Sequence, residues 1–105
     1  MPVCELSGGR RVSYDECGDG PPLVLLHAFP LDRTMWEPQL PALSEVARVV
    51  APDFPGFGES SPAGFTVDGA ADLVAEFLTA LGIEKAVVGG LSMGGYVALA
   101  LARRH

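Results

Sequence analysis

The sequence predicts an α/β domain in which a mostly parallel sheet carries helices on both faces. Apolar runs at residues 23–26 and 46–51, and a third that begins at residue 86, show no polar alternation. Such runs are typical of strands buried on both faces of a sheet. Segments with helical spacing of apolar residues separate these runs. Strands that alternate with crossover helices build a parallel sheet, which gives the fold class.

The chain opens with a predicted β-hairpin. Residues 3–6 and 11–17 are strand-like and flank the turn Ser7-Gly8-Gly9-Arg10. This pairing places Cys4 opposite a residue near Ser13 and not opposite Cys17, so no disulfide is expected. We expect both cysteines to be reduced, buried, small apolar side chains, which suits a cytoplasmic protein.

Three helical segments are expected between and after the strands. The first, residues 35–47, has prolines near its start and is expected to be short or irregular; its apolar spacing comes from Trp36, Leu40, Leu43 and Ala47. A long loop rich in Gly, Pro and Ser covers residues 53–64. The second helix spans residues 67–81, with Thr66 as its N-cap and Gly82 as its stop. The third begins at Ser92 or Met93 and runs to His105.

The composition limits the classes of partner. Of the 105 residues, 49% are hydrophobic and 19% are charged, and the formal net charge is -6. A globular domain of this charge is not expected to bind nucleic acid or an anionic membrane. The N-terminus lacks the pattern of a signal peptide, and no apolar run reaches the roughly 20 residues of a membrane span. No metal-binding motif is present, and neither a metal nor an organic cofactor is expected.

The chemistry is expected at Gly90-Leu91-Ser92-Met93-Gly94, which has the pattern G-x-S-x-G. The pattern alone is weak, but here it joins a buried strand to a helix, the setting of a nucleophile elbow. A Cβ at Gly90 or Gly94 would clash with the tightly folded backbone nearby. Ser92 begins a helix, where the N–H of Met93 is free to bind an oxyanion. The plainer alternative makes Ser92 an ordinary N-cap between loop glycines.

Three segments together resemble the first part of an α/β-hydrolase. His27-Ala28-Phe29-Pro30 resembles the H-G-x-P loop of that family, residues 53–60 (DFPGFGES) resemble its D-x-x-G-x-G-x-S loop, and residues 90–95 resemble its nucleophile elbow. The combination is similar to the subgroup of 3-oxoadipate enol-lactonases, small carboxylesterases and cofactor-free perhydrolases. Ala28 departs from the family pattern, which has Gly there. An alanine fits if its φ is negative.

The resemblance implies a fold and a set of roles. The sheet would have the strand order 1-2-4-3-5, Ser92 would be the nucleophile, and the backbone N–H groups of Phe29 and Met93 would form the oxyanion hole. His27 and Pro30 would shape the oxyanion loop, while Gly90 and Gly94 would shape the elbow. The loop after the fourth strand would be ordered by Asp53, Gly56, Gly58 and Ser60. Related epoxide hydrolases and haloalkane dehalogenases carry Asp at the elbow, so Ser92 favours hydrolysis of a small carboxylic ester or lactone through an acyl-enzyme.

A serine hydrolase also needs a base and an acid, which follow the serine in this family. Only His105 follows Ser92, and at about 1.5 Å per helical residue it lies roughly 20 Å away. His27 is expected to be structural, and Asp32 and Asp53 are weaker candidates for the acid. We therefore expect residues 1–105 to be the N-terminal portion of a single α/β-hydrolase domain, truncated before the acid and base. Alone it is expected to be inactive and poorly soluble, with residues 86–90 as an exposed edge strand available for pairing.

Two alternatives remain open from the sequence. In the first alternative, the chain is a non-catalytic fragment, or a subunit that another chain completes. In the other alternative, the same elbow supports perhydrolysis, acyl transfer or cleavage of a carbon–carbon bond. The first 105 residues do not separate these reactions.

Overall fold

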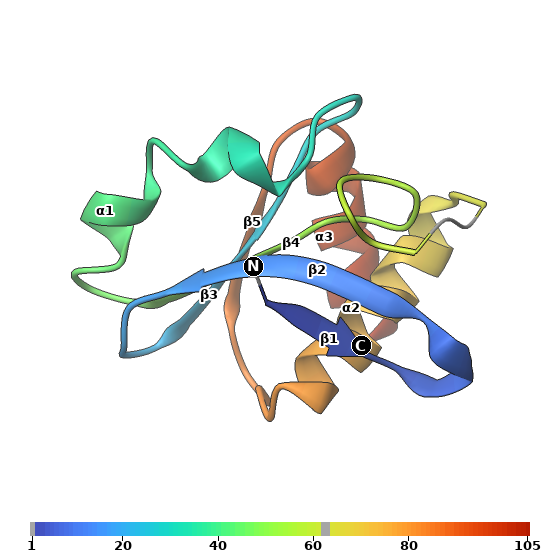
Figure 1. The fold of residues 1–105 in the computed structure, drawn as a ribbon, viewed down its shortest axis with the longest axis horizontal. Coiled ribbons are helices and arrows are strands. Elements are labelled where there is room, and N and C mark those ends of the chain that lie inside the picture. Colours follow the sequence, from blue (N-terminus) through green and yellow to red (C-terminus); the bar gives the residue numbers. More distant parts are fainter. Residues whose placement is uncertain (1, 62–63) are drawn as a thin grey trace.

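The computed structural model describes residues 2–61 and 64–105, which form one five-stranded sheet with helices on both faces (Figure 1). The strand order is β1-β2-β4-β3-β5, as the resemblance implies. The strands are β1 (Val3–Glu5), β2 (Arg11–Cys17), β3 (Pro22–Leu26), β4 (Arg48–Pro52) and β5 (Val87–Gly90). The α-helices are α1 (Leu40–Leu43), α2 (Val67–Ala80) and α3 (Met93–Arg104), and short 3-10 helices are η1 (Ser7–Gly9) and η2 (Arg33–Trp36).

The sheet is antiparallel at its start and parallel in its centre. β1 pairs with β2, and β2 pairs with β4, in antiparallel fashion. β3 lies between β4 and β5 and is parallel to both. Cys4 lies opposite Val12, so the predicted hairpin register is correct to within one residue, and both cysteines are free. Because β3, β4 and β5 are parallel, their carboxyl ends lie at one edge of the sheet.

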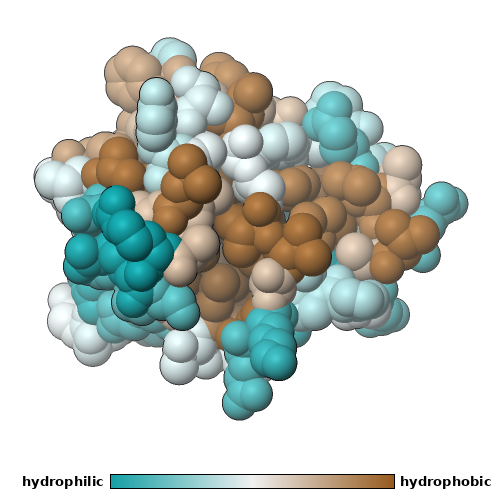
Figure 2. Space-filling model, turned by 180° about the vertical axis from the view of Figure 1, so that it is seen from behind, coloured by the Kyte–Doolittle hydropathy of each residue, from teal (hydrophilic) through white to brown (hydrophobic). Residues whose placement is uncertain are grey.

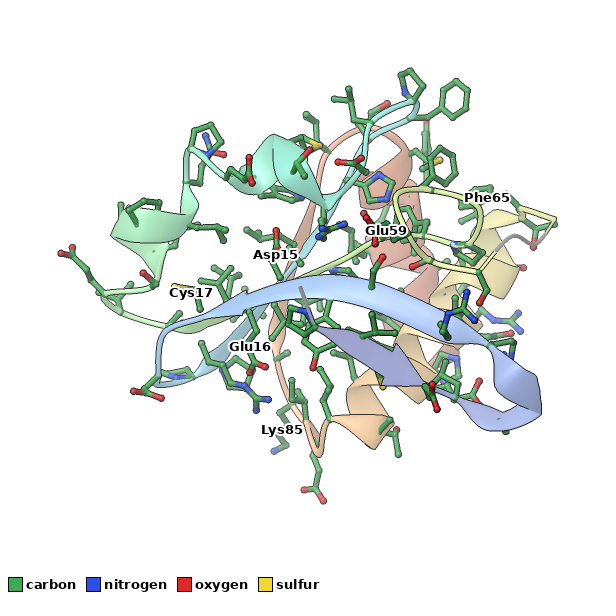
Figure 3. The ribbon with its side chains drawn as sticks, in the orientation of Figure 1. Asp15, Glu16, Cys17, Glu59, Phe65 and Lys85 are labelled. Atoms are coloured by element: carbon green, nitrogen blue, oxygen red, sulfur yellow. The ribbon has the colours of Figure 1, made fainter. Side chains whose placement is uncertain are left out.

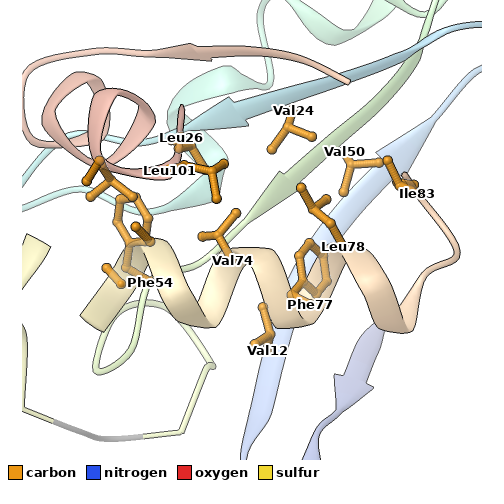
Figure 4. Close-up of a cluster of buried hydrophobic side chains, with 14 residues drawn as sticks. Val12, Val24, Leu26, Val50, Phe54, Val74, Phe77, Leu78, Ile83 and Leu101 are labelled. Atoms are coloured by element: carbon orange, nitrogen blue, oxygen red, sulfur yellow. The ribbon is translucent and has the colours of Figure 1, made fainter. Parts of the chain in front are cut away.

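Alternating side chains of the central strands supply two hydrophobic cores. Val24 and Leu26 of β3 and Val50 of β4 face α2 and α3, where Phe77 is fully buried (Figure 4). The residues between them, such as Leu25 and Val49, face the other side, where they pack with Trp36, Leu40 and Leu43. Continuous apolar runs are required because each of these strands is covered on both faces.

The two long helices, α2 and α3, begin and end within one residue of the predicted positions. The Thr66 side chain accepts a hydrogen bond from the N–H of Gly69 at 2.9 Å and caps α2. Gly82 has φ of +75° and stops that helix. The predicted irregular helix at 35–47 is divided into η2 and α1, and its apolar residues do form one face.

Two expectations about burial or length are wrong, and a third is confirmed. The strand predicted at 46–51 begins at Arg48, because Val46 lies in the turn after α1 and is 71% exposed. The exposed edge strand expected at residues 86–90 is confirmed, because β5 is the edge of the sheet and Val87 is 68% exposed, although an apolar run alone is typical of a strand buried on both faces. Cys17 is exposed, because the last residues of β2 extend beyond the part that pairs with β1 (Figure 3).

The edge strand and the helix after it present an apolar surface. Figure 2 shows apolar residues gathered on the back of the molecule. The large exposed side chains of β5, α3 and the turn between them are Val87, Leu91, Tyr96 and Leu99. Among the described residues, no helix is both long and apolar enough to cross a membrane.

The first turn of α3 lies directly against the backbone at the end of β3. A Cβ on Gly94 would lie 2.1 Å from the carbonyl oxygen of Leu26, a contact that no side chain can make. At Gly95 the nearest atom to such a Cβ is the Gly90 carbonyl oxygen at 3.6 Å, an ordinary contact. Two adjacent glycines therefore differ in whether the fold needs them.

We predict that Gly94→Ala severely destabilises the full-length protein, whereas Gly95→Ala is tolerated or slightly stabilising. The first change pushes α3 away from β3, and the second raises helix propensity by about 1 kcal/mol relative to glycine. Chemical denaturation of the two variants beside the wild type measures the difference. Equal stability of both variants would contradict the close approach.

Candidate active site

The link between β5 and α3 is a strained turn with Ser92 at its apex. Ser92 has φ of +54° and ψ of -113°, and among the described residues no other residue except glycine has a positive φ. Such a conformation costs roughly 1–3 kcal/mol and persists only where the surroundings impose it. The structure therefore holds Ser92 in a position that an ordinary helix start does not require.

The surrounding backbone explains how this turn is imposed. A Cβ on Gly90 would lie 2.3 Å from the carbonyl carbon of Gly94, so β5 and α3 touch directly through their glycines. The Leu91 N–H donates to the carbonyl oxygen of Leu26 at 3.3 Å, and the Gly94 N–H donates to that of Leu91 at 3.0 Å. The turn is thus fixed on β5, on α3 and on the end of β3.

Ser92 is exposed and does not act as a helix cap. Its side chain makes no capping hydrogen bond, which argues against the plainer interpretation as an N-cap. Within the described part of the chain, the N–H of Met93 donates no hydrogen bond, and neither does the N–H of Phe29. Both donors follow strands that end at the carboxyl edge of the sheet: Met93 begins α3 after β5, and Phe29 lies in the loop after β3. The site thus combines an exposed hydroxyl with free N–H groups and a positive helix end.

The loop after β3 is held by buried groups. The His27 ring is fully buried; its Nε2 accepts from the Phe54 N–H at 3.0 Å, and its Nδ1 donates to the Ala28 carbonyl oxygen at 3.0 Å. The Ala28 N–H donates to the sulfur of Met35 at 3.3 Å. Ala28 does not have a positive φ, so alanine fits where the family has glycine. Phe29, at the tip of this loop, is 67% exposed.

The carboxylate of Asp53 joins this loop to the loop after β4. Asp53 is buried and accepts from the Arg33 N–H at 2.8 Å and from the Arg33 guanidinium at 2.6 Å. It also accepts from the Ser13 hydroxyl at 2.5 Å and from the Glu59 N–H at 3.4 Å. The Ser60 hydroxyl donates to the Asp53 carbonyl oxygen at 2.9 Å.

Two glycines complete the loop after β4. Gly58, with φ of +52°, leaves no room for a Cβ, which would meet the Asp53 carboxylate at 2.2 Å. Gly56 has φ of +82°, and its N–H donates to the Ser61 carbonyl oxygen. Asp53, Gly56, Gly58 and Ser60 are therefore parts of the scaffold of this loop.

Aromatic rings line the same region. The Phe29 and Phe57 rings lie 5.8 Å apart, and Phe57 also contacts His27 and Phe65 edge-on. Edge-to-face pairs of this kind stabilise the packing beyond the area that they bury. The side chains of Phe29 and Phe57 form an apolar area beside the free N–H of Phe29.

The remaining candidates for a base or an acid are committed elsewhere. The His105 ring lies 2.8 Å from the Asp72 carboxylate, at the opposite end of α3 from Ser92. Hydrogen bonds from Arg104 and His105 lower the pKa of Asp72 to about 2. Asp32 caps η2 by accepting from the Thr34 N–H, and hydrogen bonds from Thr34 lower its pKa.

Arg33 holds the loop after β3 in place and was not predicted from the sequence. Arg33 contacts Asp53 and also Asp15 of β2, at 3.1 Å. Although burial opposes the charge, the hydrogen bonds to Asp53 and Asp15 raise the pKa of Arg33. The partners lie 18 and 20 residues away in sequence, so no local pattern indicates them. A lone arginine beside an apolar loop was the one available signal.

We predict that His27 makes stability depend on pH. Burial lowers the pKa of His27, against the hydrogen bond to Ala28, and the ring is neutral because Nε2 accepts an N–H. The unfolded state takes up a proton near pH 6.5 and the folded state only at lower pH, so the free energy of unfolding falls as the pH drops below about 6.5. Denaturation of the full-length protein between pH 7.5 and 5 should show a smaller fall for His27→Gln, whose amide oxygen still accepts from Phe54. An equal fall in both proteins would mean that His27 is protonated as easily when folded.

Comparisons with known proteins place this chain. The sequence model of the family described as alpha/beta hydrolase fold matches residues 21–105. An acetyltransferase component of the acetoin cleaving system (dihydrolipoyllysine-residue type) from Cupriavidus necator is 46% identical over 97 residues, which cover 90% of this chain and 26% of that protein. A soluble epoxide hydrolase from a Corynebacterium species is 41% identical over 92 residues, covering 86% and 32%. This chain thus spans about a third or less of these relatives.

Solved structures agree closely with the fold. A thermophilic esterase from Thermogutta terrifontis has a TM-score of 0.90 and 41% identity, covering 99% of this chain and 41% of that one. An enol-lactonase from Burkholderia xenovorans LB400 has a TM-score of 0.91 and 35% identity, covering 99% and 42%. Together with the family match and the strand order around the elbow, these findings show that the chain belongs to the α/β-hydrolase family.

Proposed function

We propose that this chain provides the nucleophile and the oxyanion hole of a hydrolase that cleaves carboxylic esters or lactones through an acyl-enzyme on Ser92. The observation that carries the proposal is the exposed, strained Ser92 at the junction of β5 and α3. Strain at one residue, imposed by closely packed glycines, is expected where the backbone must present a reactive side chain. The esterase and the enol-lactonase among the similar structures support this substrate class.

The proposed reaction begins with attack by the Ser92 hydroxyl oxygen on the carbonyl carbon of the ester. The carbonyl oxygen becomes an oxyanion, which the N–H groups of Phe29 and Met93 stabilise. One such donor is typically worth about 2.7–4 kcal/mol in the transition state. The serine proton passes through a base to the leaving alkoxide, and water then cleaves the acyl-enzyme to release the acid.

The general base and its carboxylate partner belong to another segment. His27 is buried, with both ring nitrogens in hydrogen bonds, and His105 is bound to Asp72 at the far end of α3. The buried Asp53 carboxylate forms an ion pair with Arg33. We therefore propose that residues 1–105 alone are inactive, and that the base and acid lie outside them.

The side chains around Ser92 favour an acyl group with an apolar surface. Phe29 is largely exposed and packs edge-on against Phe57, and Met93 follows the nucleophile directly. An apolar surface beside the oxyanion hole gains binding energy from a hydrocarbon acyl chain at roughly 25 cal/mol per Å² buried. The sequence identity of 41% to an epoxide hydrolase does not change the expected chemistry. A serine at the elbow favours acyl transfer over the opening of an epoxide.

Acyl transfer to an acceptor other than water is the second candidate. The relative with 46% identity is named as an acetyltransferase component, and the elbow itself does not select the acceptor. Adding an alcohol, an amine or hydrogen peroxide to the assay distinguishes the two, since a transferase forms the new acyl product at the expense of free acid.

We predict that Ser92→Ala lowers the turnover of the full-length protein by about 10⁴-fold or more, because no other group replaces the nucleophile. A panel of 4-nitrophenyl esters of increasing chain length, with simple lactones, measures the loss. Ser7→Ala is the matched control, since Ser7 is exposed on η1. Equal activity of wild type and Ser92→Ala on every substrate would overturn the proposed function.

A further inference from the structure

We propose that Arg33 is a positioning residue for this reaction: its bridge to Asp53 and Asp15 fixes the loop that carries the Phe29 N–H. The inference rests on the proposed function, because it concerns the oxyanion hole of the same site. It assigns a role to a residue outside the three motifs of the sequence. The role follows from where the Arg33 contacts lie in the fold.

Arg33 is the downstream anchor of the oxyanion loop. The loop leaves the sheet at the end of β3, after Leu26, and reaches η2 at Arg33. Arg33 binds Asp53 twice, through its backbone N–H and through its guanidinium. Phe29 lies between the end of β3 at Leu26 and the anchor at Arg33, so the position of its N–H depends on both of them.

The anchor is rigid because it is buried and charged. The side chain of Arg33 is 12% exposed, that of Asp53 is 0% exposed and that of Asp15 is 25% exposed. In such surroundings a planar guanidinium holds two carboxylates in a fixed geometry, which the single ammonium of lysine does not reproduce. The bridge also ties the loop to β2 through Asp15.

The Asp53 carboxylate also orders the loop after β4, which carries Phe57. Asp53 accepts from the Glu59 N–H and is packed against Gly58, so it orders the loop that carries Phe57. Phe57 in turn packs edge-on against the ring of Phe29. Arg33 therefore balances the charge of Asp53, which orders both the loop that carries Phe29 and the loop that carries Phe57.

The chain offers a matched control for the loss of an ion pair. Arg48 of β4 forms an ion pair with Glu16, the residue next to Asp15 on β2. Asp15 and Glu16 point to opposite faces of the strand (Figure 3). Both arginines thus bind carboxylates of β2, but Arg33 is the first residue of η2, directly after the loop that carries Phe29, and Arg48 belongs to a central strand.

The test compares Arg33→Lys with Arg48→Lys in the full-length protein. We expect Arg33→Lys to lower kcat by about 10- to 100-fold with KM within twofold, since misplacing an oxyanion donor affects the transition state selectively. A boronic acid that adds to the serine should lose affinity by a similar factor. Arg48→Lys should leave kcat and boronate affinity within twofold. A folded Arg33→Lys enzyme with unchanged kcat and boronate affinity would overturn the proposal.

A second variant keeps the proposal testable if Arg33→Lys does not fold. Asp15→Asn removes only the more exposed partner, and it should lower kcat severalfold and speed amide hydrogen exchange in residues 28–36 but not in α3. Unchanged kcat and exchange in a folded Asp15→Asn protein would count against the positioning role. Failure of the proposed function gives a different pattern, because the wild type then matches Ser92→Ala on all esters and lactones.

Discussion

The site depends on one close approach, in which the first turn of α3 lies against the end of β3 with no space for side chains between them. The carbonyl of Leu26 occupies the position that a Cβ on Gly94 would need, and the backbone of Gly94 does the same for Gly90. The chain must therefore reverse within a few residues, and Ser92 takes up the strain. Without glycines at both positions, α3 would move outward and the turn would relax. The exposed serine is thus a consequence of backbone packing.

A buried charge organises the rest of the site. Asp53 receives hydrogen bonds from β2, from the first residue of η2 and from the loop after β4. Burying a carboxylate is costly unless it is paired and hydrogen-bonded, and Arg33 supplies both interactions. The position of the oxyanion loop is therefore linked to the hydrogen bonding of a single side chain. Elbow and loop come from distant parts of the sequence and meet because β3 and β5 are adjacent and parallel.

The sequence predicted most of the fold because its signals are local. Continuous apolar runs identified β3 and β4, Thr66 and Gly82 identified the ends of α2, and the glycines around Ser92 identified the elbow. The errors arose where burial depends on neighbours. Val46 is apolar but lies exposed in the turn after α1, and Cys17, although it pairs with Val49 of β4, lies beyond the part of β2 that pairs with β1. The Arg33 bridge was not predictable, because its partners come from other strands and no spacing rule connects them.

The central claim is that Ser92 forms a covalent acyl intermediate. Its most direct test is mass spectrometry of the full-length protein, quenched in acid within milliseconds of mixing with an activated ester and then digested. We expect one added acyl group on the peptide that contains Ser92, and none after Ser92→Ala. An acyl group on a different residue, or turnover of the ester with no adduct on any peptide, would contradict it.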